Sequence, residues 1–264
     1  MERTNYHTHT KRCKHAGGTE LDYVKAALEK KLSVLGFSDH APYPDDRMGM
    51  RMDYVELKSY IEEVLQLKEQ YRKELSILLG LEIEFDPREM DYYYQLKEEM
   101  GIEYLLLGQH AYIDKRGETI NIYSLEQTKD TSHYLEYANS LKDAMKTGLF
   151  PVIAHPDVIF INQMPWDKNC EEACDRIVEA AISTNTILEF NGNGIRRGKI
   201  QYEDGIRYPY PHERFWEKVA KANGTVIINS DCHSPDNIWD TCMDKAYELA
   251  QNWRLQVVNH FPLK

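Results

Sequence analysis

No apolar stretch of the 264-residue chain is long enough to cross a bilayer, and no charged-then-apolar signal segment opens it. The chain also lacks a linker rich in proline, glycine or serine, a low-complexity tract and an internal repeat. We therefore expect a cytoplasmic protein folded as a single domain over residues 1–264. A hydrophobic content of 42% is enough to bury a substantial core in a chain of this length.

Cysteine is scarce and cannot be fully paired. The five cysteines are Cys13, Cys170, Cys174, Cys232 and Cys242, an odd number in a chain too long to need disulfides. We expect reduced thiols, as in a cytosolic protein. Cys13 and Cys232 flank candidate metal ligands, and coordination by either thiol is the less favoured alternative. Cys170 and Cys174, four residues apart, are assigned to helix packing.

Basic residues are outnumbered, with 32 Lys and Arg against 43 Asp and Glu, which gives a net charge of −11. This balance argues against a general nucleic-acid binder, because such a protein needs a basic track for the phosphates. A site that handles phosphate in this chain must draw its positive charge locally, from metal ions and one or two arginines.

Seven short apolar runs with the composition of buried strands recur along the chain. The first leads to His7, and the others cover residues 32–37, 75–81, 104–107, 150–154, 186–190 and 225–229. Between them, helical patterning covers residues 53–71, 126–146, 170–182, 212–222 and 236–253, and Thr19 with Asp22 marks a helix start. This alternation predicts an α/β fold with a parallel sheet, either a barrel or a doubly wound sheet.

Residues able to bind metal follow nearly every run, at the point where the strand should end. They are His7-x-His9, Asp39-His40, Glu82 with Glu84, His110, His155-Pro156-Asp157, Asn191-Gly192-Asn193-Gly194 and Asp231-Cys232-His233. In a strand, His7 and His9 would project to the same side. Because all strand C-termini of a barrel open onto one face, this placement predicts one shared site at that face.

The chain resembles the PHP (polymerase and histidinol phosphatase) superfamily in motifs that run through almost its whole length: His7-x-His9, His15, Asp39-His40, Gly80-Leu81-Glu82, His110, His155-Pro156 and Asp231-x-His233. The resemblance implies a distorted (β/α)7 barrel, TIM-like, with a metal cluster at the C-terminal ends of the strands. It also implies two or three divalent metal ions, which the ligand types allow to be zinc, iron or manganese.

Nine residues are implied as metal ligands by this resemblance. His7, His9, Glu82 and Asp231 would bind the first ion. Glu82 would bridge to a second ion, completed by His110 and His155, and a third ion would be held by His15, His40 and His233. Asp39 is assigned the role of orienting a ligand.

Within the superfamily, the chain looks most like the histidinol-phosphate phosphatases. The stretch Asp39-His40-Ala41-Pro42 leads to a charged helix, and a chain of this length leaves no room for a polymerase domain. This resemblance implies hydrolysis of L-histidinol phosphate to L-histidinol and phosphate, in histidine biosynthesis. Glu82, Asp231 and His233 would be catalytic, with a metal-activated hydroxide attacking phosphorus.

The remaining candidates concern the substrate, a small phosphate ester. At least one of Arg196 and Arg197 is expected to clamp phosphate, because a guanidinium suits its oxygens as a bidentate donor. Glu84, Asp157 and the acidic loop Asp45-Asp46 are candidates for binding the cationic end of L-histidinol phosphate. Glu84 lies on the same side of its strand as Glu82, so spacing alone does not choose the bridging ligand.

Two other functions stay open from the sequence. A PHP-type phosphoesterase acting on nucleotides or nucleic-acid ends would need a basic or aromatic groove, for which the sequence gives little support. A non-catalytic metal-binding barrel serving a partner would need only four closed ligands, fewer than the nine implied. We therefore expect a phosphatase with no nucleic-acid or membrane partner.

Overall fold

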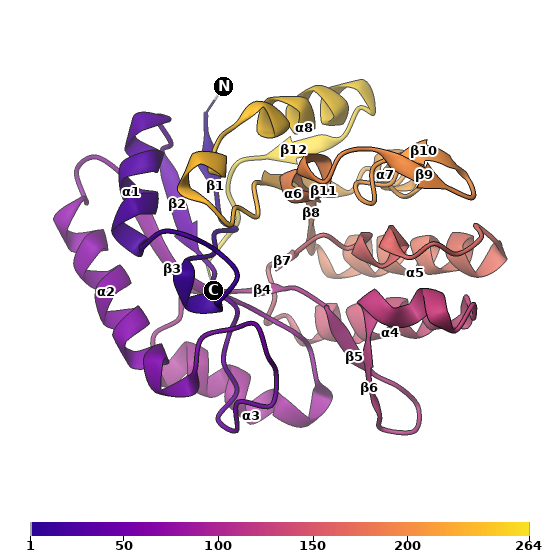
Figure 1. Cartoon of the computed structure of the whole chain (residues 1–264), viewed down its shortest axis with the longest axis horizontal. Coiled ribbons are helices and arrows are strands. Elements are labelled where there is room, and N and C mark those ends of the chain that lie inside the picture. The colour runs from indigo at the N-terminus through magenta and orange to yellow at the C-terminus, as the bar shows by residue number, and fades with distance from the viewer. Residues whose placement is uncertain (1, 264) are drawn as a thin grey trace.

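A computed structural model describes residues 2–263, and Figure 1 shows its strands gathered at the centre with helices around them. One sheet has the strand order β1-β2-β3-β4-β7-β8-β11-β12, and every neighbouring pair is parallel. Its strands are β1 (Thr4–Asn5), β2 (Val34–Phe37), β3 (Ser76–Ile83), β4 (Tyr104–Leu107), β7 (Val152–Ile153), β8 (Ile187–Asn191), β11 (Thr225–Asn229) and β12 (Gln256–Val258).

Seven of these strands coincide with the seven apolar runs, which confirms the predicted parallel α/β barrel. The eighth strand, β12, lies outside the runs and pairs with β11. Only Val257 and Val258 are strand-type residues in it, between Gln256 and Asn259, so it leaves no recognisable pattern.

The α-helices lie in the connections between strands, and the longer ones surround the sheet (Figure 1). They are α1 (Glu20–Glu29), α2 (Leu57–Gln70), α3 (Met90–Tyr94), α4 (Ser132–Thr147), α5 (Lys168–Thr184), α6 (Gly192–Arg196), α7 (Glu213–Lys221) and α8 (Thr241–Asn252). The predicted start of α1 is confirmed, because Thr19 and Asp22 form a reciprocal capping box. None of the helices within residues 2–263 is both long and apolar enough to span a membrane.

Shorter elements lie outside the predicted pattern. Two antiparallel hairpins pair β5 (Ala111–Ile113) with β6 (Thr119–Asn121), and β9 (Ile200–Tyr202) with β10 (Gly205–Arg207). Short 3-10 helices cover Lys11–Cys13, Tyr54–Glu56, Pro87–Glu89, Ile122–Gln127, Val158–Ile161 and Pro235–Asn237, and a π-helix covers Gln95–Glu99.

The two sides of the sheet meet at the C-terminal ends of its strands. Beyond β1 and β11, Thr8 and Cys232 form an isolated parallel bridge. The His9 amide donates to the Cys232 carbonyl at 3.0 Å, and the Cys232 amide donates to the His7 carbonyl at 3.3 Å. This pairing closes the sheet into a distorted barrel and brings the first histidines of the chain beside Asp231.

Alternate strand residues fill the barrel at its N-terminal end. The inner cluster consists of Tyr6, Val34, Tyr104, Leu106, Val152, Ile187, Ile227 and Phe261. Tyr104 lies across it, and its hydroxyl donates to the carbonyls of Tyr6 and Phe37 at 2.8 and 2.9 Å. Because this cluster fills the N-terminal half of the barrel, inward-pointing side chains nearer the C-terminal ends of the strands face the open end.

Gly80 of β3 makes room for the Tyr104 ring. A Cβ at Gly80 would lie 2.3–2.7 Å from three atoms of that ring. We expect Gly80→Ala to lower the free energy of unfolding by about 1–3 kcal/mol, as overpacking does in other cores. Urea denaturation measures this change, and Gly17→Ala is the control, because a Cβ there meets nothing within 4 Å. Equal midpoints for the two variants would contradict the tight packing.

Candidate metal centre and active site

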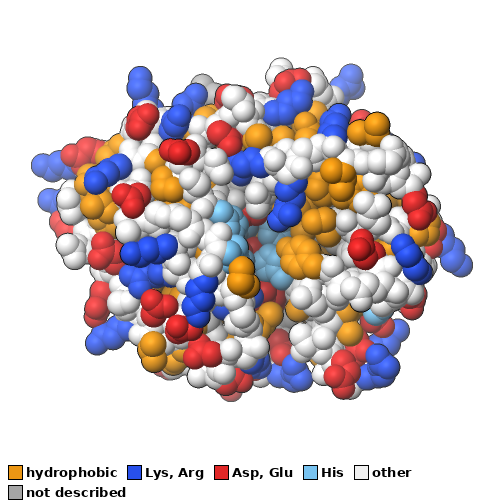
Figure 2. Space-filling view, viewed as in Figure 1, with side chains coloured by type: hydrophobic (Ala, Val, Ile, Leu, Met, Phe, Trp, Pro, Cys, Tyr) orange, Lys and Arg blue, Asp and Glu red, His pale blue; other side chains and the backbone are white. Residues whose placement is uncertain are grey.

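A cavity of about 700 Å³ opens at the C-terminal ends of the strands. Figure 2 looks onto this face and shows histidine side chains gathered in a central hollow. Among the cavity-lining residues are His15, His40, Glu82, His110, Tyr123, His155, Arg197, Tyr210, Asp231 and His233. Seven of the nine predicted metal ligands thus line one cavity, and the other two, His7 and His9, are fully buried against them.

Glu82 lies at the centre of this cluster because strand alternation points it inward. Leu78 and Gly80 of β3 face the inner cluster, so Glu82 faces the same side, nearer the cavity. Its Oε1 is 3.0 Å from His155 Nε2, and its Oε2 is 2.9 Å from His40 Nδ1. Nitrogens of three further imidazoles lie 3.4–3.6 Å from the carboxylate: His7, His9 and His110. One carboxylate therefore lies within 3.6 Å of five imidazoles, a position from which it could contact two ions.

Asp231 supplies a second buried carboxylate, just beyond β11. Its Oδ1 lies 3.3 Å from His9 Nε2 and 3.5 Å from both His7 Nε2 and His233 Nδ1. Asp231 and His155 have φ values of 49° and 30°, which side-chain-bearing residues rarely adopt. Backbone strain of this kind concentrates at functional sites, where surrounding structure holds it in place.

A third group lies at the more exposed side of the cluster. One nitrogen from each of His15, His40 and His233 falls within 4.8 Å of the others, and the Nε2 atoms of His15 and His233 are 3.1 Å apart. The structure thus brings together all nine residues of the predicted ligand set, from strand ends that are far apart in the sequence.

Several buried polar atoms of this cluster lack a hydrogen-bond partner within residues 2–263. They include His7 Nε2, both ring nitrogens of His9, and Glu82 Oε2. An unsatisfied buried polar atom costs about 1–3 kcal/mol. Divalent cations bound by imidazole nitrogens and carboxylate oxygens would satisfy these atoms, so the residues present fit zinc, iron or manganese.

Charges within the cluster are mutually stabilised. Burial opposes ionisation of Glu82, but His7, His110 and His40 hold the pKa of Glu82 well below its ordinary value. Burial likewise disfavours a charged His7, but the carboxylates of Glu189, Asp231 and Glu82 hold the pKa of His7 well above its ordinary value. Without metal, His7 therefore retains a proton in place of a cation.

Metal binding is expected to release that proton from His7. A metal ion needs the Nε2 lone pair, which the raised pKa keeps protonated at neutral pH in the metal-free protein. The apparent affinity for Zn²⁺ should therefore rise with pH, by up to about tenfold per unit below the pKa of His7. Calorimetric titration with Zn²⁺ in buffers of different ionisation enthalpy counts the released protons, and a pH-independent affinity without proton release would contradict this expectation.

Glu189, which the sequence analysis did not single out, positions two of the candidate ligands. It is fully buried in β8, and its Oε1 accepts from His7 Nδ1 at 2.8 Å and from Asn229 Nδ2 at 2.9 Å. Its Oε2 accepts from the His155 amide at 3.0 Å and from Asn191 Nδ2 at 2.7 Å. Such a carboxylate fixes the tautomer of a metal-binding imidazole. The sequence feature that could have identified Glu189 is its charge, which lies inside the apolar run 186–190.

Asp39 holds the segment that follows His9. Its carboxylate accepts from the Thr10 amide at 2.8 Å and from the Thr10 hydroxyl at 2.6 Å, and Oδ1 lies 4.0 Å from His9 Nδ1. Burial raises the pKa of Asp39 to about 7 despite these donors. This geometry fits the orienting role expected for Asp39.

The two adjacent arginines have different surroundings. Arg197 lines the cavity, where its Nε donates to the Tyr210 hydroxyl at 3.3 Å. Arg196 instead donates to Asp240 and to the Ser230 carbonyl, both at 2.6 Å, and is outside the cavity lining. The expectation of a phosphate clamp therefore narrows to Arg197, because local hydrogen bonds occupy Arg196.

Glu84 and Asp157, two of the carboxylates expected at the cationic end of the substrate, already accept hydrogen bonds from other residues. Glu84 Oε1 accepts from Arg51 at 2.7 Å and lies 3.0 Å from His110 Nδ1, and these neighbours lower the pKa of Glu84 to about 2 despite its burial. Asp157 accepts from the His212 amide at 2.6 Å and from Trp216 Nε1 at 3.0 Å, and is 1% exposed. Glu84 thus orients a candidate ligand, and Asp157 anchors the loop that precedes α7.

Two tyrosines of the cavity wall come from segments with no sequence signal. The Tyr123 ring lies 6.1 Å from that of His110 with an interplanar angle of 17°. Tyr210 lies 6.1 Å from the His155 ring and borders Arg197. Tyr123 belongs to the short 3-10 helix Ile122–Gln127 and Tyr210 to an irregular connection, and the position of both segments depends on contacts distant in sequence.

Known proteins resemble the chain in both sequence and structure. A probable histidinol-phosphatase of Deinococcus radiodurans is 26% identical over 250 residues, covering 92% of this chain and 91% of the relative. A histidinol-phosphatase of Bacillus subtilis is 35% identical over 92 residues, which cover 32% of this chain and 34% of the relative.

A solved structure shares the fold. The histidinol phosphate phosphatase of Lactococcus lactis, crystallised with zinc, L-histidinol and phosphate, superposes with a TM-score of 0.72 at 17% identity. The match covers 97% of this chain and 95% of that one, which confirms the barrel.

The family itself follows from a match over most of the chain. Residues 5–193 match the family described as PHP domain, and they include the first seven of the nine candidate ligands. The resemblance inferred from the motifs is therefore confirmed, and the chain belongs to the PHP domain family.

Proposed function

We propose that this chain is a metal-dependent phosphomonoesterase that hydrolyses L-histidinol phosphate to L-histidinol and phosphate, a step of histidine biosynthesis. One observation carries the proposal: seven imidazoles and two carboxylates converge beside a cavity that also holds Arg197. Support for the substrate comes from the relatives named histidinol-phosphatase and from the Lactococcus lactis protein crystallised with L-histidinol and phosphate.

Two or three divalent ions would be held by the nine candidate ligands. His7, His9, Glu82 and Asp231 would hold one ion, Glu82 with His110 and His155 a second, and His15, His40 and His233 a third. Zinc, iron and manganese all suit nitrogen and carboxylate ligands. When bound, such ions supply a hydroxide nucleophile near neutral pH and neutralise charge on the phosphoryl oxygens.

The protein's own groups then have distinct tasks. Neighbouring imidazoles hold the pKa values of Glu82 and Asp231 well below their ordinary values despite burial. Both side chains therefore provide negative charge for binding cations. Arg197 binds phosphoryl oxygens, with its guanidinium oriented by Tyr210. His233, partly exposed at the cavity, either completes the third metal site or delivers a proton to the leaving alkoxide.

Phosphate release from a panel of esters tests the proposal. Protein reconstituted with Zn²⁺, Mn²⁺ or Fe²⁺ should release phosphate from L-histidinol phosphate with a higher kcat/KM than from nucleotides. Preferred hydrolysis of nucleotides or of single-stranded DNA would instead support the alternative phosphoesterase. Metal-loaded protein inactive on every ester would support a non-catalytic barrel.

The arginine pair provides a matched comparison. Arg197→Ala should raise the KM for L-histidinol phosphate by about tenfold or more, because a charge-assisted contact to phosphate contributes about 1.5–3 kcal/mol. Arg196→Ala should leave KM nearly unchanged and lower the melting temperature, because Arg196 links α6 to Ser230 and Asp240. Steady-state kinetics measure the KM of both variants, and thermal denaturation measures their melting temperatures. A KM raised only in Arg196→Ala would instead identify Arg196 as the phosphate-binding arginine.

A further inference from the structure

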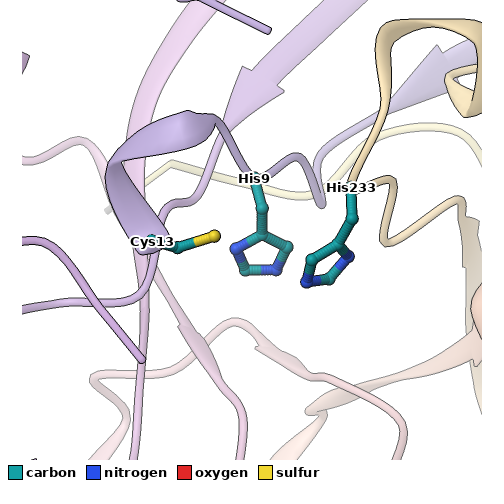
Figure 3. A group of neighbouring side chains, drawn as sticks. All are labelled: His9, Cys13 and His233. Carbon is teal, nitrogen blue, oxygen red and sulfur yellow. The ribbon is translucent and has the colours of Figure 1, made fainter. Parts of the chain in front are cut away.

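Cys13 lies against the imidazole cluster, although neither the sequence motifs nor the sites proposed above use its thiol. It ends the short helix Lys11–Cys13 and is fully buried. Figure 3 shows its sulfur directed at the ring of His9, with the ring of His233 beside that of His9. The His9 and His233 ring centroids are 4.5 Å apart.

The three side chains have the spacing of a metal site. Cys13 Sγ, one nitrogen of His9 and one nitrogen of His233 all lie within 4.8 Å of one another. A single ion binds such atoms at about 2.0–2.3 Å, so the three side chains would draw slightly closer together around it. His9 is fully buried, and neither of its ring nitrogens has a hydrogen-bond partner within residues 2–263. A buried imidazole whose ring nitrogens make no hydrogen bond within these residues therefore lies beside the sulfur, although its Nε2 is 3.3 Å from Asp231 Oδ1.

The local backbone also suits a bound thiolate. Burial raises the pKa of Cys13 to about 12, while backbone amides of His15 and Ala16 act in the opposite direction, as hydrogen-bond donors to the sulfur. Donors of this kind stabilise the charge of a sulfur bound to metal. A buried thiol beside two imidazoles suits a cation with high affinity for sulfur.

We propose that His9, Cys13 and His233 form a binding site for a soft divalent cation, such as Cd²⁺ or excess Zn²⁺. Binding forms a sulfur–metal bond and releases the thiol proton to solvent, with no change in oxidation state. The site shares His9 and His233 with the nitrogen and carboxylate cluster, so a soft ion bound there withdraws two imidazoles from that cluster. Harder ions such as Mn²⁺ do not compete for it, because they favour oxygen ligands.

Cys232 is the matched comparison within the same chain. It is equally buried, but its Sγ donates to the His7 carbonyl at 3.8 Å and to the Thr8 hydroxyl at 3.7 Å. In the described part of the chain, Cys232 joins none of the residue groups able to hold a metal. A soft ion should therefore discriminate between these two thiols.

Titration of the metal-depleted full-length protein with Cd²⁺ tests the site without any activity assay. The ultraviolet charge-transfer band from sulfur to cadmium should appear in the wild-type protein and in Cys232→Ser, and should be absent in Cys13→Ser. No band in the wild-type protein, or an equal band in Cys13→Ser, would overturn the proposal.

A second variant keeps the test decisive if Cys13→Ser does not fold. His233→Ala retains the thiol but removes one ligand, so the Cd²⁺ concentration at half-saturation of the band should rise by at least tenfold. An unchanged half-saturation would exclude the three-ligand site. Because the measurement uses no substrate, its result is independent of whether the chain hydrolyses L-histidinol phosphate.

Discussion

Glu82→Gln is expected to lose phosphatase activity by about 1,000-fold or more and to lose most of its bound metal. The amide keeps the shape of the side chain but removes the charge and one of the two oxygens that approach five imidazoles. Asp231, the second buried carboxylate, makes fewer close approaches, because its Oδ1 lies 3.3–3.5 Å from nitrogens of His7, His9 and His233.

Kinetics on L-histidinol phosphate and elemental analysis of the dialysed protein measure both effects. Glu217→Gln, on the exposed face of α7, is the control and should match the wild-type protein. Far-ultraviolet circular dichroism should show a folded barrel, because the inner cluster around Tyr104 does not depend on Glu82. A Glu82→Gln variant with wild-type metal content and activity would refute the bridging role.

Glu189→Gln is expected to lower metal affinity and activity by about 100-fold, the upper end of the effects of residues that orient metal ligands. The Glu189 carboxylate accepts from four donors, of which His7 and the His155 amide belong to candidate ligands. An amide would turn one end of the side chain into a donor that faces other donors. Either His7 or the His155 backbone would then lose its acceptor.

Rescue distinguishes this variant from Glu82→Gln. All nine candidate ligands remain in Glu189→Gln, so added Zn²⁺ should restore much of its activity, whereas Glu82→Gln should not respond. Glu179→Gln, exposed on α5, is the control. If saturating Zn²⁺ left the kcat of Glu189→Gln as low as that of Glu82→Gln, a role limited to positioning would be excluded.

The strands could be predicted from sequence because a barrel strand is buried on both faces. Runs such as 104–107 and 225–229 are mostly apolar, and charged residues or histidines follow most runs where the strands reach the cavity. Glu82 lies near the end of β3 and Asp231 lies just beyond β11. Their positions in the sequence therefore predicted that both lie at the cavity. The strand β12 has no apolar run followed by ligand-type residues, and therefore could not be predicted from the sequence.

The surroundings of individual side chains could not be predicted, because their partners are distant in sequence. Arg196 and Arg197 are neighbours, yet Asp240 of a later segment pairs with the first and leaves the second in the cavity. The sequence pattern also predicted Asp157 as a substrate-binding carboxylate, but in the structure it accepts a hydrogen bond from Trp216 of α7. Motif spacing identifies which residues reach the C-terminal face, and tertiary contacts decide which of them remain free to bind a substrate.

Anomalous X-ray diffraction from crystals of the zinc-reconstituted protein tests the central claim most directly. Two or three peaks should lie at the C-terminal ends of the strands, with Glu82 bridging two of them and His7, His155 and Asp231 as neighbouring ligands. Density peaks that avoid Glu82, or a cavity that stays free of metal at saturating Zn²⁺, would contradict it.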